Sequence, residues 1–370
     1  MELTELTEGN VSTYVMDEVG LPKPDKKVQI SRVSITKAKV KSMRNLTHDT
    51  YELILKGDTT LLGAKAGQFG TIKVGDVKKP RSYSFARDPR NEKPNEHTFF
   101  IRLVSDGEMS QWLSGDDRVG TEVTLSGPLG EFSLDSSEDA MICIAGGSGM
   151  SAVYALLECA ALNKVKRDCY FFYGARTQED LYLDKEIAAI KKQWDKDHTF
   201  EFVQVLSEEP EGSDWKGGRG FVTDYFKAEY LDKGTVDINK CKAFFCGPPP
   251  MIDAGAKVLA AAGMNESSIH YDKFEDASSP APVIDNEKCV LCDECLLVKP
   301  VENCIVEIAG LNGKDFVPLD PANTSGLYYN TLYIDEDACI RCYACVYACP
   351  HDAISPENNR TPSTLRKMTS

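Results

Sequence analysis

The sequence lacks a long hydrophobic run: no stretch approaches the roughly 18 consecutive apolar residues of a membrane-spanning helix. The first twenty residues contain no lysine or arginine and no apolar core, so they do not resemble a signal peptide. Positive charge is also scarce, because 42 Lys and Arg face 57 Asp and Glu, which leaves a net charge of −15. An acidic surface disfavours nucleic acid and favours a basic protein partner. We therefore expect a soluble, cytoplasmic protein that binds neither nucleic acid nor a membrane.

Two long regions of the chain differ in their pattern of apolar and polar residues. Residues 33–134 consist of short alternating segments such as TYELILKG, GTIKVG and TEVTLSG, separated by turns with Gly or Pro, which predicts an antiparallel β-barrel. From residue 135 to 275, apolar segments such as MICIAGG and CKAFFCG alternate with helical ones, which predicts a doubly wound parallel α/β sheet. The other predicted parts are an N-terminal arm (1–32), a linker rich in Ser, Ala and Pro (276–284), a small α+β domain (285–358) and a tail (359–370).

Cysteine is sparse over most of the chain and crowded near its end. Five of the thirteen cysteines are scattered before residue 280, and the other eight fall between residues 289 and 349. Secreted disulfide frameworks show similar crowding, but we do not expect one here, because no signal peptide is evident. Of the scattered cysteines, Cys143, Cys159, Cys169 and Cys241 lie in apolar segments and are expected to be inert parts of the core.

The crowded cysteines have the spacing of a bacterial ferredoxin. The segment ACIRCYACVYACP has the pattern C-x2-C-x2-C-x3-C-P, in which three thiolates bind one 4Fe-4S cluster and the fourth binds a second cluster. Upstream, KCVLCDECLLVKPVENC begins with the same spacing, but its fourth cysteine follows after eight residues and without a proline. The crossing rule predicts two 4Fe-4S clusters, one bound by Cys289, Cys292, Cys295 and Cys349, and one bound by Cys304, Cys339, Cys342 and Cys345.

Two alternatives to this assignment stay open. Paired C-x2-C units also bind structural zinc, although the third cysteine in each run leaves no natural tetrahedral set. The widened gap before Cys304 also leaves open a second cluster with only three thiolate ligands.

Six motifs follow one another between residues 33 and 275: RSYSFA, DGEMSQWL, GPLGEF, IAGGSGMSAV, YGARTQEDL and FFCGPPPMI. Together and in this order they resemble the ferredoxin–NADP reductase superfamily, above all the reductase components that supply oxygenases with electrons. The resemblance implies an FAD-binding barrel followed by an NAD(P)-binding α/β domain.

The first two motifs suit a flavin diphosphate, which is anionic and favours an arginine and backbone N–H groups. We expect FAD to be bound by Arg81 and Ser82, and by the helix start formed by Gly107, Met109 and Ser110. The resemblance implies that Tyr83 packs against the flavin and that Ser84 approaches N5, where hydride arrives. Taken alone, RSYS would be compatible with a plain barrel strand.

The later motifs suit a nicotinamide dinucleotide. The glycines of GGSGM follow an apolar strand and open a helix, which allows a diphosphate to approach backbone amides. The pattern is not the G-x-G-x-x-G fingerprint and is weak alone. The resemblance implies that Cys246 lies beside the nicotinamide, whereas a buried structural cysteine is the alternative. The expected nucleotide-binding residues are Gly146, Gly147, Gly149, Arg176, Cys246, Gly247 and Pro248.

Two further expectations depend on single residues. Oxygenase reductases carry a segment similar to IHYDKFE, so Phe274 is expected either to cover the flavin or simply to pack. A 2′-phosphate needs clustered basic groups, and Arg176 is accompanied by three acids in GARTQEDLYLD, which favours NADH over NADPH.

These parts predict an order of electron transfer. A nicotinamide gives two electrons as hydride, a 4Fe-4S cluster takes one, and flavin converts between the two. The leading hypothesis is the reductase component of a multicomponent oxygenase, although such reductases more often carry a plant-type 2Fe-2S ferredoxin. The alternatives are an electron-input subunit of an anaerobic reductase, and a carrier or redox sensor without reductase activity. Residues 281–370 hold thirteen Asp or Glu and seven Lys or Arg, so we expect the protein acceptor to dock there through a basic patch.

Overall fold

The computed structural model describes residues 33–57, 61, 63–75, 77–115, 117–273, 280–311, 315–318 and 331–356. The expected N-terminal arm, Phe274, most of the linker and the tail lie outside these residues. The chain divides into two compact units. One comprises Thr36–Leu125 and Glu131–Phe274, and the other comprises Met1–Ile35, Ser126–Gly130 and Glu275–Ser370.

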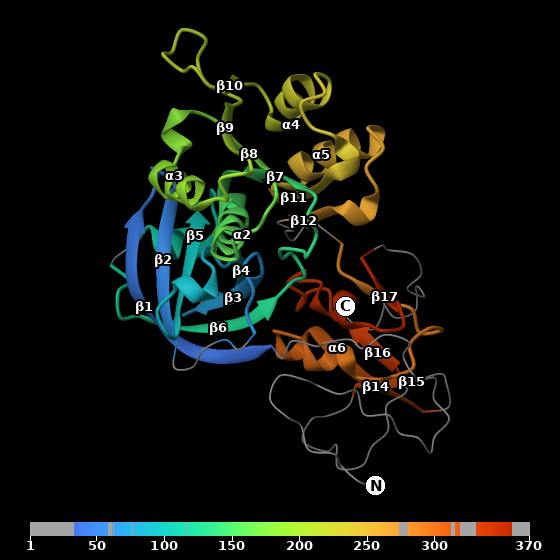
Figure 1. Ribbon diagram of the computed structural model, residues 1–370. Helices are drawn as coiled ribbons and strands as arrows, with labels where there is room; N and C mark the ends of the chain where they lie inside the picture. Colours follow the sequence, from blue (N-terminus) through green and yellow to red (C-terminus); the bar gives the residue numbers. More distant parts are fainter. Residues whose placement is uncertain are drawn as a thin grey trace. The chain divides into compact units, whose positions relative to one another are not determined.

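The first part of the chain forms a nearly closed antiparallel barrel (Figure 1). Its elements are β1 (Ser34–Asn45), β2 (Thr50–Gly57), β3 (Phe69–Val74), β4 (Arg81–Ser84), β5 (Glu96–Arg102), α1 (Glu108–Leu113) and β6 (Glu122–Leu129). The strands lie in the order β4-β3-β6-β1-β2-β5, and a bridge between Phe85 and Phe99 connects the two ends of the sheet. Alternate residues point inward, as at Leu53 and Leu55 of β2, because successive side chains of a strand face opposite sides. The barrel prediction is confirmed.

The next part forms a parallel sheet covered by helices on both faces (Figure 1). Its strands are β7 (Ala140–Gly146), β8 (Cys169–Ala175), β9 (Phe200–Leu206), β10 (Gly218–Arg219), β11 (Cys241–Gly247) and β12 (Ile269–Lys273). Its helices are α2 (Met150–Leu162), α3 (Asp184–Gln193), α4 (Val222–Phe226) and α5 (Pro249–Ala261). Helices α2 and α3 share one core with the sheet, and α4 and α5 share the other.

The order of the parallel strands determines where a ligand binds. The strands lie in the order β10-β9-β8-β7-β11-β12, so the chain moves outward in one direction from β7 and in the other direction from β11. Ligands of doubly wound sheets bind at the carboxyl ends of the strands, where the order reverses. The doubly wound prediction is confirmed. Cys143 and Cys169 are fully buried in this sheet, as expected of inert core cysteines.

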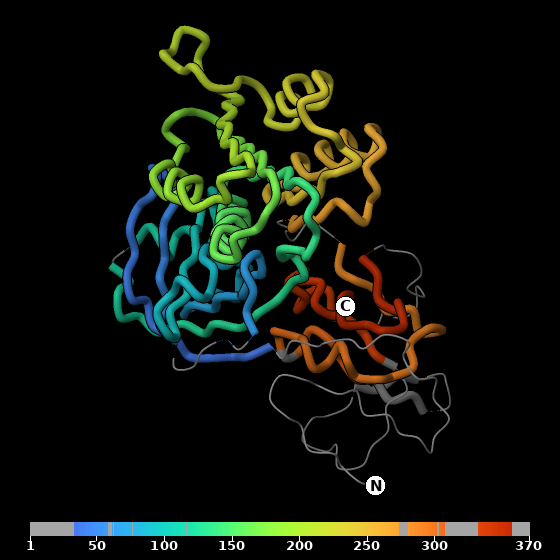
Figure 2. The backbone as a smooth tube through the Cα atoms, viewed as in Figure 1, coloured from blue at the N-terminus to red at the C-terminus, as the bar shows by residue number. Residues whose placement is uncertain are grey.

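The cysteine-rich end contains short elements arranged as an internal repeat. They are β13 (Val283–Ile284), α6 (Glu294–Leu297), β14 (Ile305–Leu311), β15 (Asp315–Pro318), β16 (Thr331–Ile334), α7 (Ala344–Ala348) and β17 (Ile354–Ser355). Strand β13 pairs with β17, and β14 lies between β15 and β16. Leu291 and Asp293 have left-handed φ angles of 57° and 63°, and Arg341 and Tyr343 have 58° and 54°. The two cysteine runs therefore have the same local fold, and Figure 2 shows the backbone of this region.

None of the helices in the described parts of the chain is long and apolar enough to cross a membrane.

Candidate functional site

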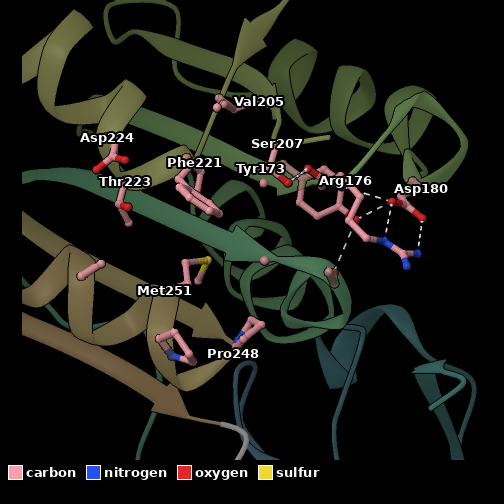
Figure 3. Close-up of a pocket in the computed structure, with 18 of the residues that line it drawn as sticks. Tyr173, Arg176, Asp180, Val205, Ser207, Phe221, Thr223, Asp224, Pro248 and Met251 are labelled. Carbon is pink, nitrogen blue, oxygen red and sulfur yellow. Dashed lines mark hydrogen bonds and ion pairs between the residues drawn. The ribbon is translucent and has the colours of Figure 1, made fainter. Parts of the chain in front are cut away.

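A cavity of about 430 Å³ lies at the carboxyl ends of β7, β8, β9 and β11 (Figure 3). The predicted residues Gly146, Gly147, Arg176 and Pro248 all line it. Figure 3 shows Arg176 and Asp180 on one side of the cavity and Phe221, Thr223 and Asp224 on the other. This is the location that the strand order predicts for a nucleotide.

The glycine turn between β7 and α2 is packed tightly against β11. Gly147 has a φ of +54°, a conformation that glycine adopts at little cost. A Cβ on Gly149 would collide with the carbonyl oxygen of Cys246, so only glycine allows α2 to begin this close to the end of β11. The hydroxyls of Tyr173 and Tyr182 donate to the Gly147 carbonyl at 3.4 and 3.2 Å and so stabilise the turn.

Two arginines from different parts of the chain meet in this cavity. Arg102 ends β5 of the barrel and Arg176 follows β8, and their Nε and Nη2 atoms donate to the same Oδ2 of Asp49 at 3.0 and 2.8 Å. Asp180 binds Arg176 through both of its oxygens. Although burial opposes it, the hydrogen bond from Arg102 lowers the pKa of Asp49. His48 lies 3.8 Å from both carboxylates, but the two guanidinium charges already balance these acids, which disfavours a metal ion.

The opposite side of the cavity carries a flat aromatic surface. Phe221 is 70% exposed although it is large and apolar, and its ring lines the cavity. An exposed ring at a cavity wall suits stacking against a planar base. Thr223 and Asp224 line the same side.

Three polar side chains come together at the ends of β4, β11 and β12. The Ser84 hydroxyl donates to Oδ2 of Asp272 at 3.4 Å and also hydrogen-bonds with the Cys246 thiol. Asp272 stands opposite Cys246 in the parallel register of β11 and β12. Burial raises the pKa of Asp272 to about 7, so its carboxyl exchanges a proton near neutral pH. Burial also raises the pKa of Cys246 well above its usual value, which keeps it a thiol.

The predicted flavin-diphosphate residues lie around the start of α1. Gly107 is the N-cap residue and no side chain caps the helix, so the first-turn N–H groups are available to an anion. The Arg81 guanidinium is 3.6 Å from the Glu108 carboxylate of this first turn. The hydroxyl of Ser110 accepts from Val104 N.

The remaining predicted flavin-binding residues have distinct surroundings. The Met109 side chain packs in the barrel core, which leaves its backbone N–H for a ligand. Tyr83 packs partly against the same core, and Ser82 is exposed.

The eight crowded cysteines form two groups of four. Cys289, Cys292, Cys295 and Cys349 line one small cavity. Burial raises the pKa of Cys295 to about 12, and the other three thiols of this group reinforce the shift. Burial likewise raises the pKa of Cys345, and Cys342, Cys339 and Cys304 are among the thiols that reinforce it. Cysteine thiolates are the protein ligands of 4Fe-4S clusters, so these cysteines can hold an iron–sulfur cluster.

Comparison with known proteins agrees with this organisation. The oxidoreductase FAD-binding domain family matches residues 37–134, the oxidoreductase NAD-binding domain family matches residues 143–257, and the 4Fe-4S binding domain family matches residues 332–355. The xylene/toluene monooxygenase electron transfer component of Pseudomonas putida is 35% identical over 261 residues, which cover 69% of this chain and 71% of that protein. The chain belongs to the ferredoxin reductase family of FAD- and NAD-binding oxidoreductases.

Other relatives of this ferredoxin reductase are similar over the same region. The propane 2-monooxygenase reductase component of Mycolicibacterium smegmatis is 32% identical, with 64% of this chain and 67% of that protein covered. The solved ferredoxin reductase of carbazole 1,9a-dioxygenase has a TM-score of 0.57 and 30% identity over 66% of this chain and 70% of that one. An Amycolatopsis cytochrome P450 reductase has a TM-score of 0.60 and 26% identity over 68% and 73%.

Sequence reasoning missed four residues that the structure places in or beside the candidate site: Asp49, Arg102, Phe221 and Asp272. Arg102 stands at the end of the apolar segment FFIR, where a charged residue indicates that the strand ends. Asp272 lies in the segment IHYDKFE, in which Phe274 alone was predicted to act. No local signal distinguishes Asp49 or Phe221, because their significance comes from partners distant in the sequence.

Proposed function

We propose that this chain is the reductase component of a multicomponent oxygenase, carrying FAD and two 4Fe-4S clusters. It oxidises NADH and delivers single electrons to a separate protein. The observation that carries the proposal is the meeting of Ser84, Cys246 and Asp272 at the end of β11, two residues before the cavity-lining Pro248, in a chain that also carries eight closely spaced cysteines. Relatives named as electron transfer or reductase components of oxygenases support the physiological role.

The proposed domains are those that the sequence predicts. Residues 33–134 bind FAD, 135–275 bind the nicotinamide dinucleotide, and 285–358 bind the clusters; residues 276–284 link the last two. We propose that the whole acts in the cytoplasm without binding nucleic acid or a membrane.

FAD converts a hydride into single electrons. In our proposal, Arg81, Ser82, Gly107 and the amides of Met109 and Ser110 bind its diphosphate, whereas the Gly107 amide itself donates to the Val104 carbonyl at 3.2 Å. Tyr83 packs against the flavin ring and Ser84 faces N5. Phe274 remains a proposed cover for the flavin.

The dinucleotide is proposed to bind across the cavity, with its diphosphate at the glycine turn and its adenine on Phe221. Gly147 lies close to the Arg102 Nη1 atom, which suits a diphosphate between the turn and this guanidinium. Cys246, Gly247 and Pro248 are proposed to contact the nicotinamide. Both basic residues that line the cavity are paired with Asp49, and Arg176 also with Asp180. No cation of the cavity lining is left over for a 2′-phosphate, which favours NADH.

A direct test of the proposed function uses purified protein under anaerobic conditions. We expect one FAD and about eight iron atoms per chain, as two cubanes imply. Addition of NADH should bleach the flavin band and then the cluster absorbance, and NADPH should do so more slowly. Bound zinc with little acid-labile sulfide would overturn the cluster assignment. A bound flavin that NADH fails to reduce would instead favour a carrier or sensor.

Arg81→Ala is expected to weaken FAD retention by about 1.5–3 kcal/mol, the contribution of a hydrogen bond to an ionised group. The measurement is the dissociation constant of FAD for the apoprotein by fluorescence. Arg44→Ala is the matched control, because Arg44 pairs with Glu52 on β1 and β2. Equal FAD affinity in the Arg81 variant and the wild type would mean that other groups bind the diphosphate.

The acceptor is proposed to dock on residues 285–358 through a basic patch. Exposed acids such as Glu336 and Asp337 stand directly before the second cysteine run. Opposite charges accelerate encounter and are screened once the Debye length falls below about 10 Å. Electron transfer to the acceptor should therefore slow steeply as salt rises, whereas flavin reduction of a small neutral dye should not. An acceptor rate that is independent of salt would contradict charge-guided docking.

A further inference from the structure

The two cysteine groups differ in charge although their backbones match. Backbone N–H groups donate to sulfur in both groups: Arg341 N to Cys339 at 3.4 Å, and Ala353 N to Cys349 at 3.3 Å. The reduction potential of a 4Fe-4S cluster depends on local charge, hydrogen bonds to sulfur and exposure. Because amide hydrogen bonds occur in both groups, the features that distinguish them are charge and exposure. We call the group of Cys289 the first site and the group of Cys304 the second site.

Two cations border the second site. The Arg341 side chain is only 8% exposed, and its Nη1 donates to the carbonyl oxygens of Cys339 at 2.8 Å and Glu336 at 3.0 Å. The Lys299 Nζ donates to the Ile305 carbonyl at 3.2 Å, one residue from Cys304. Positive charge next to the backbone of ligand residues favours added negative charge at their sulfurs, although Glu336, 3.9 Å from Arg341 Nη2, offsets part of the Arg341 charge.

The first site has the opposite arrangement at equivalent positions of the repeat. Leu291 takes the place that Arg341 has in the second run, and Asp293 takes the place of Tyr343. Asp293 stands in the chain between the ligands Cys292 and Cys295, so its negative charge opposes further negative charge at this site. Lys288 precedes the first ligand, but it is 60% exposed and lies 3.9 Å from Asp285, so its effect is screened.

Solvent exposure of the cysteines favours a higher reduction potential at the first site, opposite to the effect of charge, but it is the weaker of the two effects. Cys292 is exposed, and water near a sulfur stabilises the reduced cluster. A full charge close to a partly buried sulfur outweighs the partial exposure of one ligand, because charges interact more strongly away from water.

We propose that Lys299 and Arg341 make the cluster of the second site the one with the higher reduction potential, where electrons collect before they leave the chain. The inference rests on the proposed presence of two clusters. This assignment agrees with the position of the exposed acids Glu336 and Asp337 beside the second site, since the acceptor should dock next to the cluster from which electrons leave the chain.

The experiment is a potentiometric titration of the intact holoprotein followed by electron paramagnetic resonance. Lys299→Met is expected to shift the reduction equilibrium of the second-site cluster toward the oxidised form by about threefold to tenfold, or about 30–60 mV for one electron. Asp293→Asn is expected to raise the potential of the first-site cluster alone. Lys288→Met removes an equal charge at an exposed position and serves as the control. Arg341→Lys keeps the charge and should preserve the order of the potentials.

His351 also lines the first-site cavity, so the titration is repeated in a His351→Gln background to remove its contribution. Equal potentials in the wild type, a higher potential at the first site, or potentials that neither Lys299→Met nor Asp293→Asn moves would each overturn the inference. Iron analysis distinguishes failure of this inference from failure of the proposed function. About four iron atoms per chain, instead of about eight, would refute the two-cluster proposal itself.

Discussion

Cys304→Ser is expected to destroy or convert one of two clusters, the one proposed to be held with Cys339, Cys342 and Cys345. Cys304 is among the groups that raise the pKa of Cys342 and Cys345, so the long gap before Cys304 does not separate it from them. Serine is a poor ligand for iron in comparison with a thiolate, and the affected cluster should lose iron or become a three-iron form. Iron content should fall from about eight to about four or seven atoms per chain.

Cys349→Ser provides the matched control, because Cys349 is adjacent in sequence to the second run but lines the cavity of the first. It should damage the cluster of Cys289, Cys292 and Cys295 and leave the Cys304 cluster intact. The two variants should therefore lose different spectroscopic signals, which also assigns the signals needed to compare the potentials. Loss of the same signal in both variants would refute the crossed arrangement, and an intact pair of clusters in Cys304→Ser would show that Cys304 is not a ligand.

Asp272→Asn is expected to slow overall turnover by about 10²–10⁴-fold, the usual contribution of a positioned acid or base. Asp272 reaches the Ser84 hydroxyl at 3.4 Å, and Ser84 is the residue proposed to face N5. With flavin N5 bound at Ser84, an ionised Asp272 would be placed to accept the proton that N5 of the reduced flavin releases once both electrons have left. Since burial raises the pKa of Asp272 to about 7, turnover should rise as pH increases through about 7 in the wild type. In the Asn variant, this dependence should disappear.

The same pKa shift makes an independent prediction about stability. The carboxyl binds its proton more tightly in the folded chain than in the unfolded one, so the free energy of unfolding should fall as pH rises toward and through 7. Asp272→Asn should remove this decline and stabilise the protein above pH 7. Asp253→Asn, at an exposed position paired with Lys273, is the control. If Asp272→Asn keeps both the turnover and the pH profile of the wild type, Asp272 does not transfer the proton.

Much of the architecture could be predicted because the signals are local. Alternating residues in segments such as TYELILKG indicate barrel strands, since a strand places successive side chains on opposite faces. Continuous apolar runs such as MICIAGG indicate strands buried on both faces. The cysteine spacing is also local, because the backbone between two ligands must wrap one corner of a cluster. Arg81, the glycine turn and Cys246 could be proposed as site residues from the sequence because each belongs to a short ordered motif.

The sequence by itself determined the barrel, the doubly wound sheet and the identity of the candidate ligands, because these depend on residues near one another in the chain. Only the tertiary structure brought Asp49 against Arg176, which is 127 residues away, and Asp272 against Ser84, which is 188 residues away. It also brought the Lys299 ammonium against the Ile305 carbonyl, next to Cys304. Such pairings depend on strand order and on burial, which raises or lowers a pKa according to everything packed around a group, and no window of sequence contains that information.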